Sequence, residues 1–196
     1  FAQAVGTVLS YLSRAGARYG YEGKEIHEIY HNPTCNVFYR KSVLDEVGGF
    51  NENLITVDDE ELDYRIRSRG YRLLYTPYSI VYHYRRPNWK KFRKMAYTYG
   101  LGRMQAIKLH HEMGKYFHFI PSVVLLAFIL LVILTITNKI SLIYLSAISV
   151  ISLAGFVGLS IHINKSKNGT SFPVYVALFM IWFIFWGIGF IRGILK

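Results

Sequence analysis

Four consecutive acids, Asp58-Asp59-Glu60-Glu61, form the one cluster in this sequence with the character of a catalytic site. Adjacent carboxylates repel one another, and burial of one of them in a cleft raises its pKa. A raised pKa suits a general base that takes a proton from a hydroxyl group, and a divalent cation nearby would offset the repulsion. The alternative is a solvated helix N-terminus, which favours acids through the helix dipole alone.

The elements that must position this cluster are predicted to be mixed α and β. Leu62 and Ile66 are four residues apart and Gly70 follows, which predicts a helix with acids in its first turn and arginines in its last. A second helix is predicted over residues 40–47, ending at Gly48-Gly49. Residues 34–39, 71–75 and 79–84 are rich in β-forming side chains, and Pro77 marks the connection between the last two runs.

Composition excludes several classes of protein. The chain has 196 residues with 16 Tyr and 13 Phe, too many aromatic side chains for a disordered protein. Cys35 is the only cysteine, so no intrachain disulfide forms, and we expect it to be a core thiol. The net charge of +11 suggests either nucleic acid or anionic lipid as a partner.

The charge is divided unevenly along the chain. Residues 1–83 hold nine basic and eleven acidic residues, and residues 84–115 hold nine basic residues against Glu112 alone. Residues 116–196 hold five basic residues and no acid. The chain therefore consists of a near-neutral polar zone, a basic collar (residues 84–115) and an apolar tail.

The apolar tail predicts three transmembrane helices. Residues 119–137, 140–163 and 172–191 carry no charge, and at about 1.5 Å per residue each reaches about the 30 Å of a bilayer core. The alternative, a large soluble core, would need polar elements to cover these helices, and the tail supplies almost none. The concentration of basic residues beside the first span predicts that the collar is cytoplasmic and that the C-terminus lies outside.

Within the collar, a helix is predicted to start at Trp89 with Asn88 as its N-cap. One face of this helix is apolar and is formed by Trp89, Phe92, Ala96 and Tyr99. Another face is basic and is formed by Lys90, Lys91 and Lys94. Such a helix can lie in the headgroup plane of a membrane, or it can pack on the polar zone. A nucleic-acid partner is disfavoured because the basic stripe directly adjoins membrane spans.

Several ordered segments resemble the C-terminal half of a family 2 glycosyltransferase, closest to membrane-anchored, succinoglycan-biosynthesis-like members. The segments are Asn32-Pro33-Thr34-Cys35-Asn36-Val37-Phe38-Tyr39-Arg40, Val47-Gly48-Gly49-Phe50, Asp58-Asp59-Glu60-Glu61-Leu62-Asp63-Tyr64-Arg65, Gly70-Tyr71-Arg72 and Val81-Tyr82-His83-Tyr84. The resemblance covers about residues 1–110. It implies a GT-A fold, an α/β sandwich that binds a nucleotide sugar, and transfer of a sugar to a hydroxyl group with inversion.

The resemblance also implies roles for individual residues. Asp59 matches the family's general base, and Asp58 replaces the usual Glu beside it. His83 matches a histidine that contacts the metal, Mg²⁺ or Mn²⁺, or the donor diphosphate; a structural histidine is the alternative. The positions that would contact substrate are Asn36, Gly48, Gly49, Phe50, Glu61 and Arg65. Glu60 is expected to point to solvent.

Two departures from the family pattern stand out. The sequence has no Asp-x-Asp motif, with which the family binds metal and nucleotide, so we expect the chain to be the C-terminal part of a longer protein. The collar also lacks the Gln-x-x-Arg-Trp motif of processive members: the stretch reads Met95-Ala96-Tyr97-Thr98-Tyr99. Transfer of a single sugar is therefore expected.

Together these features predict three parts: half of a GT-A-like catalytic domain (residues 1–84), basic interfacial helices (85–116) and three transmembrane helices (117–196). The predicted protein is a multi-pass enzyme of the cell membrane with its catalytic domain in the cytoplasm. It would take a nucleotide-sugar donor and a lipid-linked acceptor, in contact with membrane lipids and no nucleic acid. The alternative is a non-catalytic membrane protein whose polar zone recruits a partner.

Overall fold

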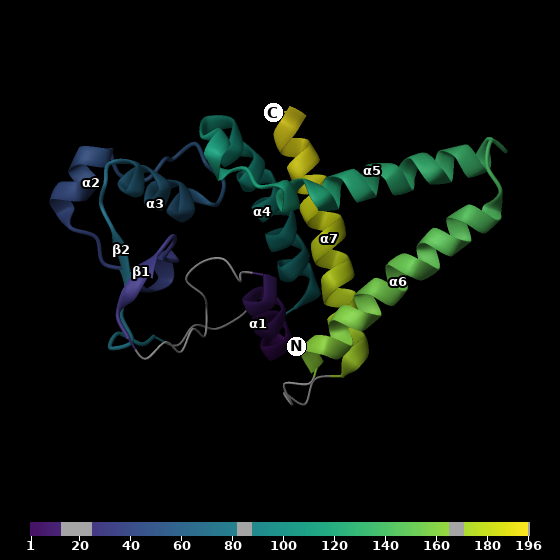
Figure 1. The fold of residues 1–196 in the computed structure, drawn as a ribbon, viewed down its shortest axis with the longest axis horizontal. Coiled ribbons are helices and arrows are strands. Elements are labelled where there is room, and N and C mark those ends of the chain that lie inside the picture. The colour runs from purple at the N-terminus through teal and green to yellow at the C-terminus, as the bar shows by residue number, and fades with distance from the viewer. Residues whose placement is uncertain (13–24, 82–87, 165–170, 196) are drawn as a thin grey trace.

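The computed structural model describes residues 1–12, 25–81, 88–164 and 171–195. A small polar domain lies at one end of the molecule, and a long helical hairpin extends from the other (Figure 1). Between them, three helices lie against one another: α1 (Ala2–Leu12), α4 (Trp89–Leu109) and α7 (Phe172–Leu195). The helix that opens with the acid cluster is therefore connected to the membrane region through α4.

The polar domain is built on two short strands and two helices. Strand β1 (His27–Ile29) pairs antiparallel with β2 (Leu73–Tyr75), with Glu28 opposite Leu74. Helix α2 (Lys41–Val47) and helix α3 (Asp58–Ser68) pack on this ribbon. Their shared core consists of Val47, Leu62, Ile66 and Leu73.

The sheet is smaller than the sequence predicted. The described residues form a single two-stranded sheet in a mostly helical chain, so the predicted GT-A sandwich is not confirmed. Residues 34–39 were predicted to be extended, but Thr34–Asn36 is a 3₁₀ helix, η1. Ser79, the first residue of the strand predicted over residues 79–84, lies outside any strand. Its carbonyl accepts instead from the side-chain amide of Asn36 at 3.0 Å. Cys35, expected in the core, is exposed.

The helices of the polar domain begin and end where the sequence predicted. Helix α2 ends at Gly48, whose φ of 86° places it in the left-handed conformation that glycine adopts without strain. Helix α3 has acids throughout its first turn, and Arg65 and Arg67 in its last. The predicted helices over residues 40–47 and from residue 58 are thus confirmed.

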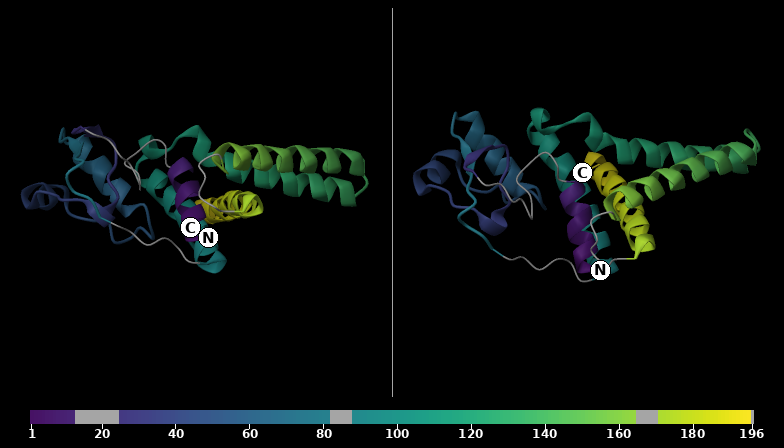
Figure 2. Two further views of the ribbon diagram at one scale, coloured as in Figure 1. Left: turned by 90° about the horizontal axis from the view of Figure 1, so that it is seen from below. Right: turned by 60° about the horizontal axis from the view of Figure 1, so that its bottom comes forward.

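Helix α4 starts at Trp89, and the side chain of Asn88 caps it by accepting from the backbone N–H of Lys91 at 2.9 Å. Part of its apolar stripe faces protein: Phe92 is fully buried against residues of α1 and α7, and Ala96 is fully buried as well, whereas Trp89 is exposed. Figure 2 shows α1 alongside these helices from two further directions. Lys90, Lys91 and Lys94 remain exposed.

The three apolar helices predicted from the sequence are present. Helices α5 (Tyr116–Ile136), α6 (Leu142–Asn164) and α7 are each long and apolar enough to cross a membrane. Helices α5 and α6 form the hairpin, and their most apolar stretches are only 11% and 0% buried by protein. In α7, 33% of the most apolar stretch is buried by protein. The boundaries predicted between the catalytic, interfacial and transmembrane parts remain a prediction.

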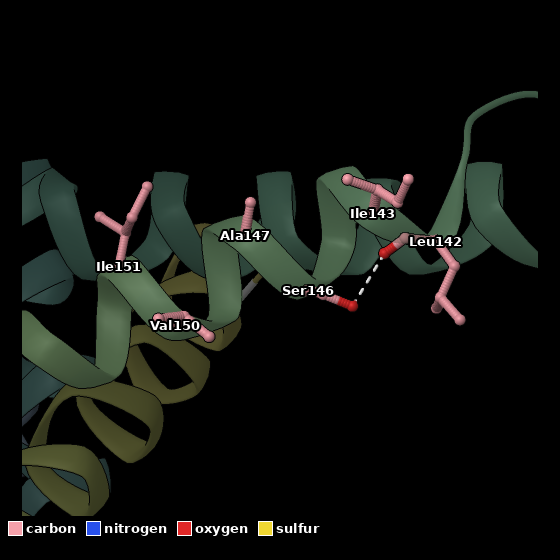
Figure 3. A pocket seen from close by; sticks show the side chains of 6 residues that line it. All are labelled: Leu142, Ile143, Ser146, Ala147, Val150 and Ile151. Carbon is pink, nitrogen blue, oxygen red and sulfur yellow. Dashed lines mark hydrogen bonds between the residues drawn. The ribbon is translucent and has the colours of Figure 1, made fainter.

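A hollow of about 570 Å³ lies on α6, lined by Leu142, Ile143, Ser146, Ala147, Val150 and Ile151 (Figure 3). Its one polar side chain, Ser146, donates its hydroxyl to the carbonyl of Leu142 at 3.0 Å. The only side-chain donor among the lining residues is therefore used within the helix, and the other lining side chains are apolar, so this surface suits lipid acyl chains.

Candidate active site

The first turn of α3 points its acids in different directions, because successive residues of a helix lie about 100° apart. Asp59 lies on the side of His31, Glu60 reaches Arg103 of α4, and Glu61 faces the loop after α2. The start of α3 is strained: Val57 adopts a left-handed φ of 69°, which is unusual for a β-branched residue. Val57 is held there by burial against Ala106 and Met113.

Asp59 is a partly buried carboxylate with a histidine beside it. Its side chain is 24% exposed, and Oδ2 lies 4.0 Å from Nε2 of His31. The backbone N–H of Glu60 donates to Oδ1 at 2.9 Å. Burial raises the pKa of Asp59, and the favourable charge of His31 and this hydrogen bond only partly oppose that rise. Asp59 therefore has the partial exposure and the basicity that a general base needs.

His31 is oriented by a second, fully buried acid. Its Nδ1 lies 2.9 Å from Oδ2 of Asp63, and the backbone N–H of Asn32 donates to the same oxygen at 2.7 Å. The hydroxyl of Tyr39 donates to Oδ1 of Asp63 at 2.9 Å. Burial alone would lower the pKa of His31, but the hydrogen bond to Asp63 and the charges of the neighbouring acids raise it.

The same neighbourhood keeps Tyr39 protonated. Burial raises the pKa of its phenol, and the negative charge of Asp63 raises it further. Tyr39 is thus a permanent donor to Asp63, which in turn holds Nδ1 of His31. This chain of contacts leaves Nε2 of His31 directed at Asp59.

Glu60 does not point to solvent, contrary to the expectation from the sequence. Both of its carboxylate oxygens accept from the guanidinium of Arg103, with Nη1 at 2.7 Å from Oε1. Arg103 is 8% exposed, so this bidentate pair joins α3 to α4 in a largely buried place. Although burial raises it, the pKa of Glu60 is lowered to about 2 by its hydrogen bonds to Arg103 and the charge of that side chain.

Glu61 and Arg65 together hold the Gly48-Gly49 turn. The guanidinium of Arg65 donates twice to the Glu61 carboxylate, from Nε to Oε1 at 2.7 Å and from Nη2 to Oε2 at 2.8 Å. The remaining donors of Arg65 bind the carbonyls of Val47 at 2.5 Å and Gly49 at 2.6 Å. His110 contacts Glu61 through Nε2 at 2.8 Å. These hydrogen bonds lower the pKa of Glu61 despite its burial, so its carboxylate is charged and fully partnered.

A pocket of about 350 Å³ opens above this network, lined by Gly48, Phe50, Asn51, Glu61, Arg65, Leu109 and His110. Its volume falls at the lower end of the range for small-molecule sites. The ring of Phe50 packs edge to face on the ring of Tyr39, with the two ring centroids 6.4 Å apart. Tyr39 thus links the pocket to the group formed by Asp59, His31 and Asp63.

The family described as glycosyl transferase family group 2 matches residues 11–190, which is most of the chain. The chain belongs to this family. No curated protein and no solved structure matches the chain. The resemblance noted from the sequence is thereby confirmed at the level of the family, and glycosyl transfer is the supported type of chemistry.

In this glycosyltransferase the residues predicted to contact substrate fall into two groups. Gly48, Phe50, Glu61 and Arg65 line the pocket, whereas Gly49 is not among the lining residues, although its carbonyl accepts from Arg65. Asn36 lies apart from them, bonded to Ser79, while Asp58 is partly buried beside Asp59. His83 lies outside the described residues.

The fit of a divalent metal was tested on the same residues. Among the described parts of the chain, no three His, Cys, Asp or Glu side chains converge as metal ligands. Glu60 and Glu61 are already occupied by Arg103, Arg65 and His110. The described residues therefore do not form a metal centre by themselves, and we derive no step through one.

Four members of the candidate site were not predicted from the sequence: His31, Asp63, Arg103 and His110. Asp63 could have been found, because it lies four residues after Asp59 and so on the same helix face. Arg103 and His110 are 43 and 49 residues from their partners Glu60 and Glu61, and no local pattern connects them.

Proposed function

We propose that this protein is a membrane-anchored inverting glycosyltransferase in which Asp59 is the general base. The observation that carries the proposal is the state of Asp59: a carboxylate with a raised pKa, partly exposed, at the start of α3. Glu60 and Glu61 of this turn are unsuited to the role, because they are bound by arginines and their pKa values are lowered.

The proposed step is a direct displacement at the anomeric carbon of a nucleotide sugar. The acceptor hydroxyl oxygen attacks from the face opposite the leaving diphosphate, and its proton passes to the Asp59 carboxylate. The bond from the anomeric carbon to the diphosphate oxygen breaks, and the nucleoside diphosphate leaves with that electron pair. His31 holds positive charge beside Asp59 and so limits how far its pKa rises.

The pocket beside the Gly48-Gly49 turn is proposed to hold the acceptor. His110 lines it from the end of α4, and α5 begins six residues later at Tyr116, so the pocket adjoins the start of the hairpin. A lipid-linked acceptor with its chain in the bilayer would present its headgroup at this level. Lys108 and Lys115 flank the pocket in sequence and would favour an anionic phosphate linkage.

The remaining parts of the proposal follow from the family resemblance and the charge distribution. The proposed donor is a nucleotide sugar, and the proposed metal is Mg²⁺ or Mn²⁺ with His83 as a ligand. The reaction would be a step in polysaccharide or glycoconjugate synthesis. The catalytic domain would face the cytoplasm, as the basic collar favours. Nucleic acid is not a proposed partner.

The test is incorporation of labelled sugar into lipid by membranes that contain the full-length protein, with a panel of nucleotide sugars. Asp59→Asn is nearly isosteric and is expected to lower transfer at least about 10²-fold while leaving protein abundance unchanged. The matched control is Asp45→Asn on α2, where the carboxylate is 62% exposed and pairs with Lys41 of the same helix.

The two variants separate the possible outcomes. Loss in Asp59→Asn together with normal transfer in Asp45→Asn would support the assignment. Near-normal transfer by Asp59→Asn would overturn the role of Asp59. Absence of incorporation from every donor by wild-type membranes would favour the non-catalytic alternative.

A further inference from the structure

Helix α7 is paired along its length with α4, and glycines bring the two backbones together. A Cβ added at Gly189 would lie 2.0 Å from the carbonyl oxygen of Tyr97, and one at Gly100 would lie 2.2 Å from that of Trp186. Further along, Gly193 meets Met104. Residue numbers rise together from Phe92 against Trp182, through Tyr97 against Gly189, to Lys108 against Ile194, so α4 and α7 run parallel (Figure 1).

The last turn of α7 lies beside the candidate active site. The ammonium group of Lys108 donates to the carbonyl of Ile194 at 2.8 Å. Two residues after Lys108, His110 lines the pocket and contacts Glu61. The C-terminal end of α7 is therefore on the same side of the membrane as the polar domain.

Both roots of the hairpin also meet α7 from the side. Near the start of α5, the hydroxyl of Ser122 donates to the carbonyl of Gly187 at 3.2 Å, and the indole of Trp186 donates to the carbonyl of His118 at 3.3 Å. Near the end of α6, Phe156 contacts Phe183 with ring centroids 5.7 Å apart. Figure 1 shows α7 running across the base of the hairpin.

These contacts argue against α7 crossing the bilayer as α5 and α6 do. A hairpin returns the chain to the side from which it started, so α7 begins on the side of the polar domain. Its last turn is on that side too. A crossing α7 would also draw α4 into the hydrocarbon, although Lys90, Lys91 and Lys94 on α4 are exposed.

We propose that α7 lies in the headgroup boundary of the leaflet that faces the active site, and that the chain crosses the membrane twice. The occupant of its free face is lipid: Met180, Ile184 and Ile188 form an exposed apolar stripe at helical spacing. On α4, exposed Arg93 lies over the ring of Phe185 of α7, 5.3 Å from its centroid, and suits anionic headgroups. Length and apolar composition alone would make α7 a third span. The proposal is independent of the reaction proposed above.

The sidedness of three cysteines tests this arrangement. Native Cys35, exposed on the polar domain, reports the active-site side. In the Cys35→Ser background, Asn138→Cys reports the hairpin tip, and Leu195→Cys reports the end of α7. Intact cells that produce the full-length protein are treated with a membrane-impermeant maleimide before and after permeabilisation. We expect Leu195→Cys to label like Cys35 and opposite to Asn138→Cys. Labelling of Leu195→Cys together with Asn138→Cys would overturn the proposal.

A depth measurement tests the same arrangement without relying on sidedness. Spin labels at Met180→Cys, Ile184→Cys and Ile188→Cys are compared by their exposure to oxygen and to a water-soluble relaxant in vesicles with anionic lipid. A helix in the interface gives three similar, shallow depths. A spanning helix gives depths that differ by about 6 Å per step. That gradient, or shielding of all three labels from both relaxants by covering protein, would overturn the proposal.

Discussion

His31 is the residue that ties the candidate base to the interior of the polar domain. It bonds through one ring nitrogen to the fully buried Asp63 and directs the other at Asp59. Two acids around one imidazole raise the pKa of His31, so it retains its proton to a higher pH than a free histidine. A protonated His31 makes Asp59 easier to ionise than burial alone would allow.

Replacing His31 by Gln is therefore expected to shift the acid limb of the pH-activity profile. Without the imidazolium, the pKa of Asp59 rises further, and activity is lost at a higher pH than in the wild type. The measurement is kcat/KM against pH, with exposed His111→Gln as the control. An unshifted limb with a lower thermal stability would show that His31 only supports the fold.

Among the elements, the contacts that fasten the polar domain to α4 include a largely buried ion pair and a close backbone approach. Glu60 binds Arg103 with both oxygens. At the adjacent position, Gly102, an added Cβ would lie 2.5 Å from the carbonyl oxygen of Thr56. Any displacement of α4 would therefore be transmitted to the start of α3, where Asp59 lies.

Glu60→Gln is expected to destabilise the protein by about 3 kcal/mol, because it leaves the buried guanidinium of Arg103 without its counter-charge. The folded-state pKa of Glu60 is about 2, below its ordinary value of 4.5. The stabilisation is thus fully present above pH 4.5 and is lost as the pH falls through about 2. Melting temperatures of wild type and variant should converge in this acid range. Exposed Glu52→Gln is the control and should be neutral at every pH.

The contact between α4 and α7 makes a separate prediction. Gly189→Ala places a methyl group against the carbonyl of Tyr97 and should cost about 1–3 kcal/mol by forcing the helices apart. Gly155→Ala on α6 is the matched control, because no other group lies within 4 Å of the added methyl. Thermal unfolding in detergent is the measurement. Equal stability of the two variants would contradict tight packing of α4 on α7.

At the scale of the whole molecule, the membrane region does more than anchor the polar domain. Helices α5 and α6 carry the apolar surface, while α1, α4 and α7 form a platform between them and the polar domain (Figure 1). The exposed lysines of α4, Lys90, Lys91 and Lys94, lie on this platform. Attraction of each to an anionic leaflet contributes about 1 kcal/mol and would set the height of the active site.

Replacement of Lys90, Lys91 and Lys94 together by Gln should leave membrane insertion intact and change activity selectively. Transfer to a lipid-linked acceptor is expected to fall and to become less sensitive to salt, because the screened attraction has been removed. Transfer to a short soluble acceptor should stay near wild type. Lys139→Gln at the hairpin tip is the control. Equal losses on both acceptors would instead indicate damage to the packing of α4.

Features that depend on neighbours along the chain could be predicted from the sequence. The period of apolar side chains and the capping residues located α2, α3, the start of α4 and the three apolar helices. The ordered motifs led to the family. The predicted strand over residues 34–39 was wrong because β structure requires a partner strand, and the described residues supply none there.

Which acids of the cluster are held by partners far away in the chain could be seen only in the folded protein. Asp59, Glu60 and Glu61 are equivalent in the sequence, but their partners His31, Arg103 and His110 come from distant elements. These partners set opposite directions for the pKa values of Asp59 and Glu60. The same holds for α7. Hydropathy measures the transfer of a helix into lipid, whereas glycine contacts with α4 and the bond from Lys108 determine where that helix lies.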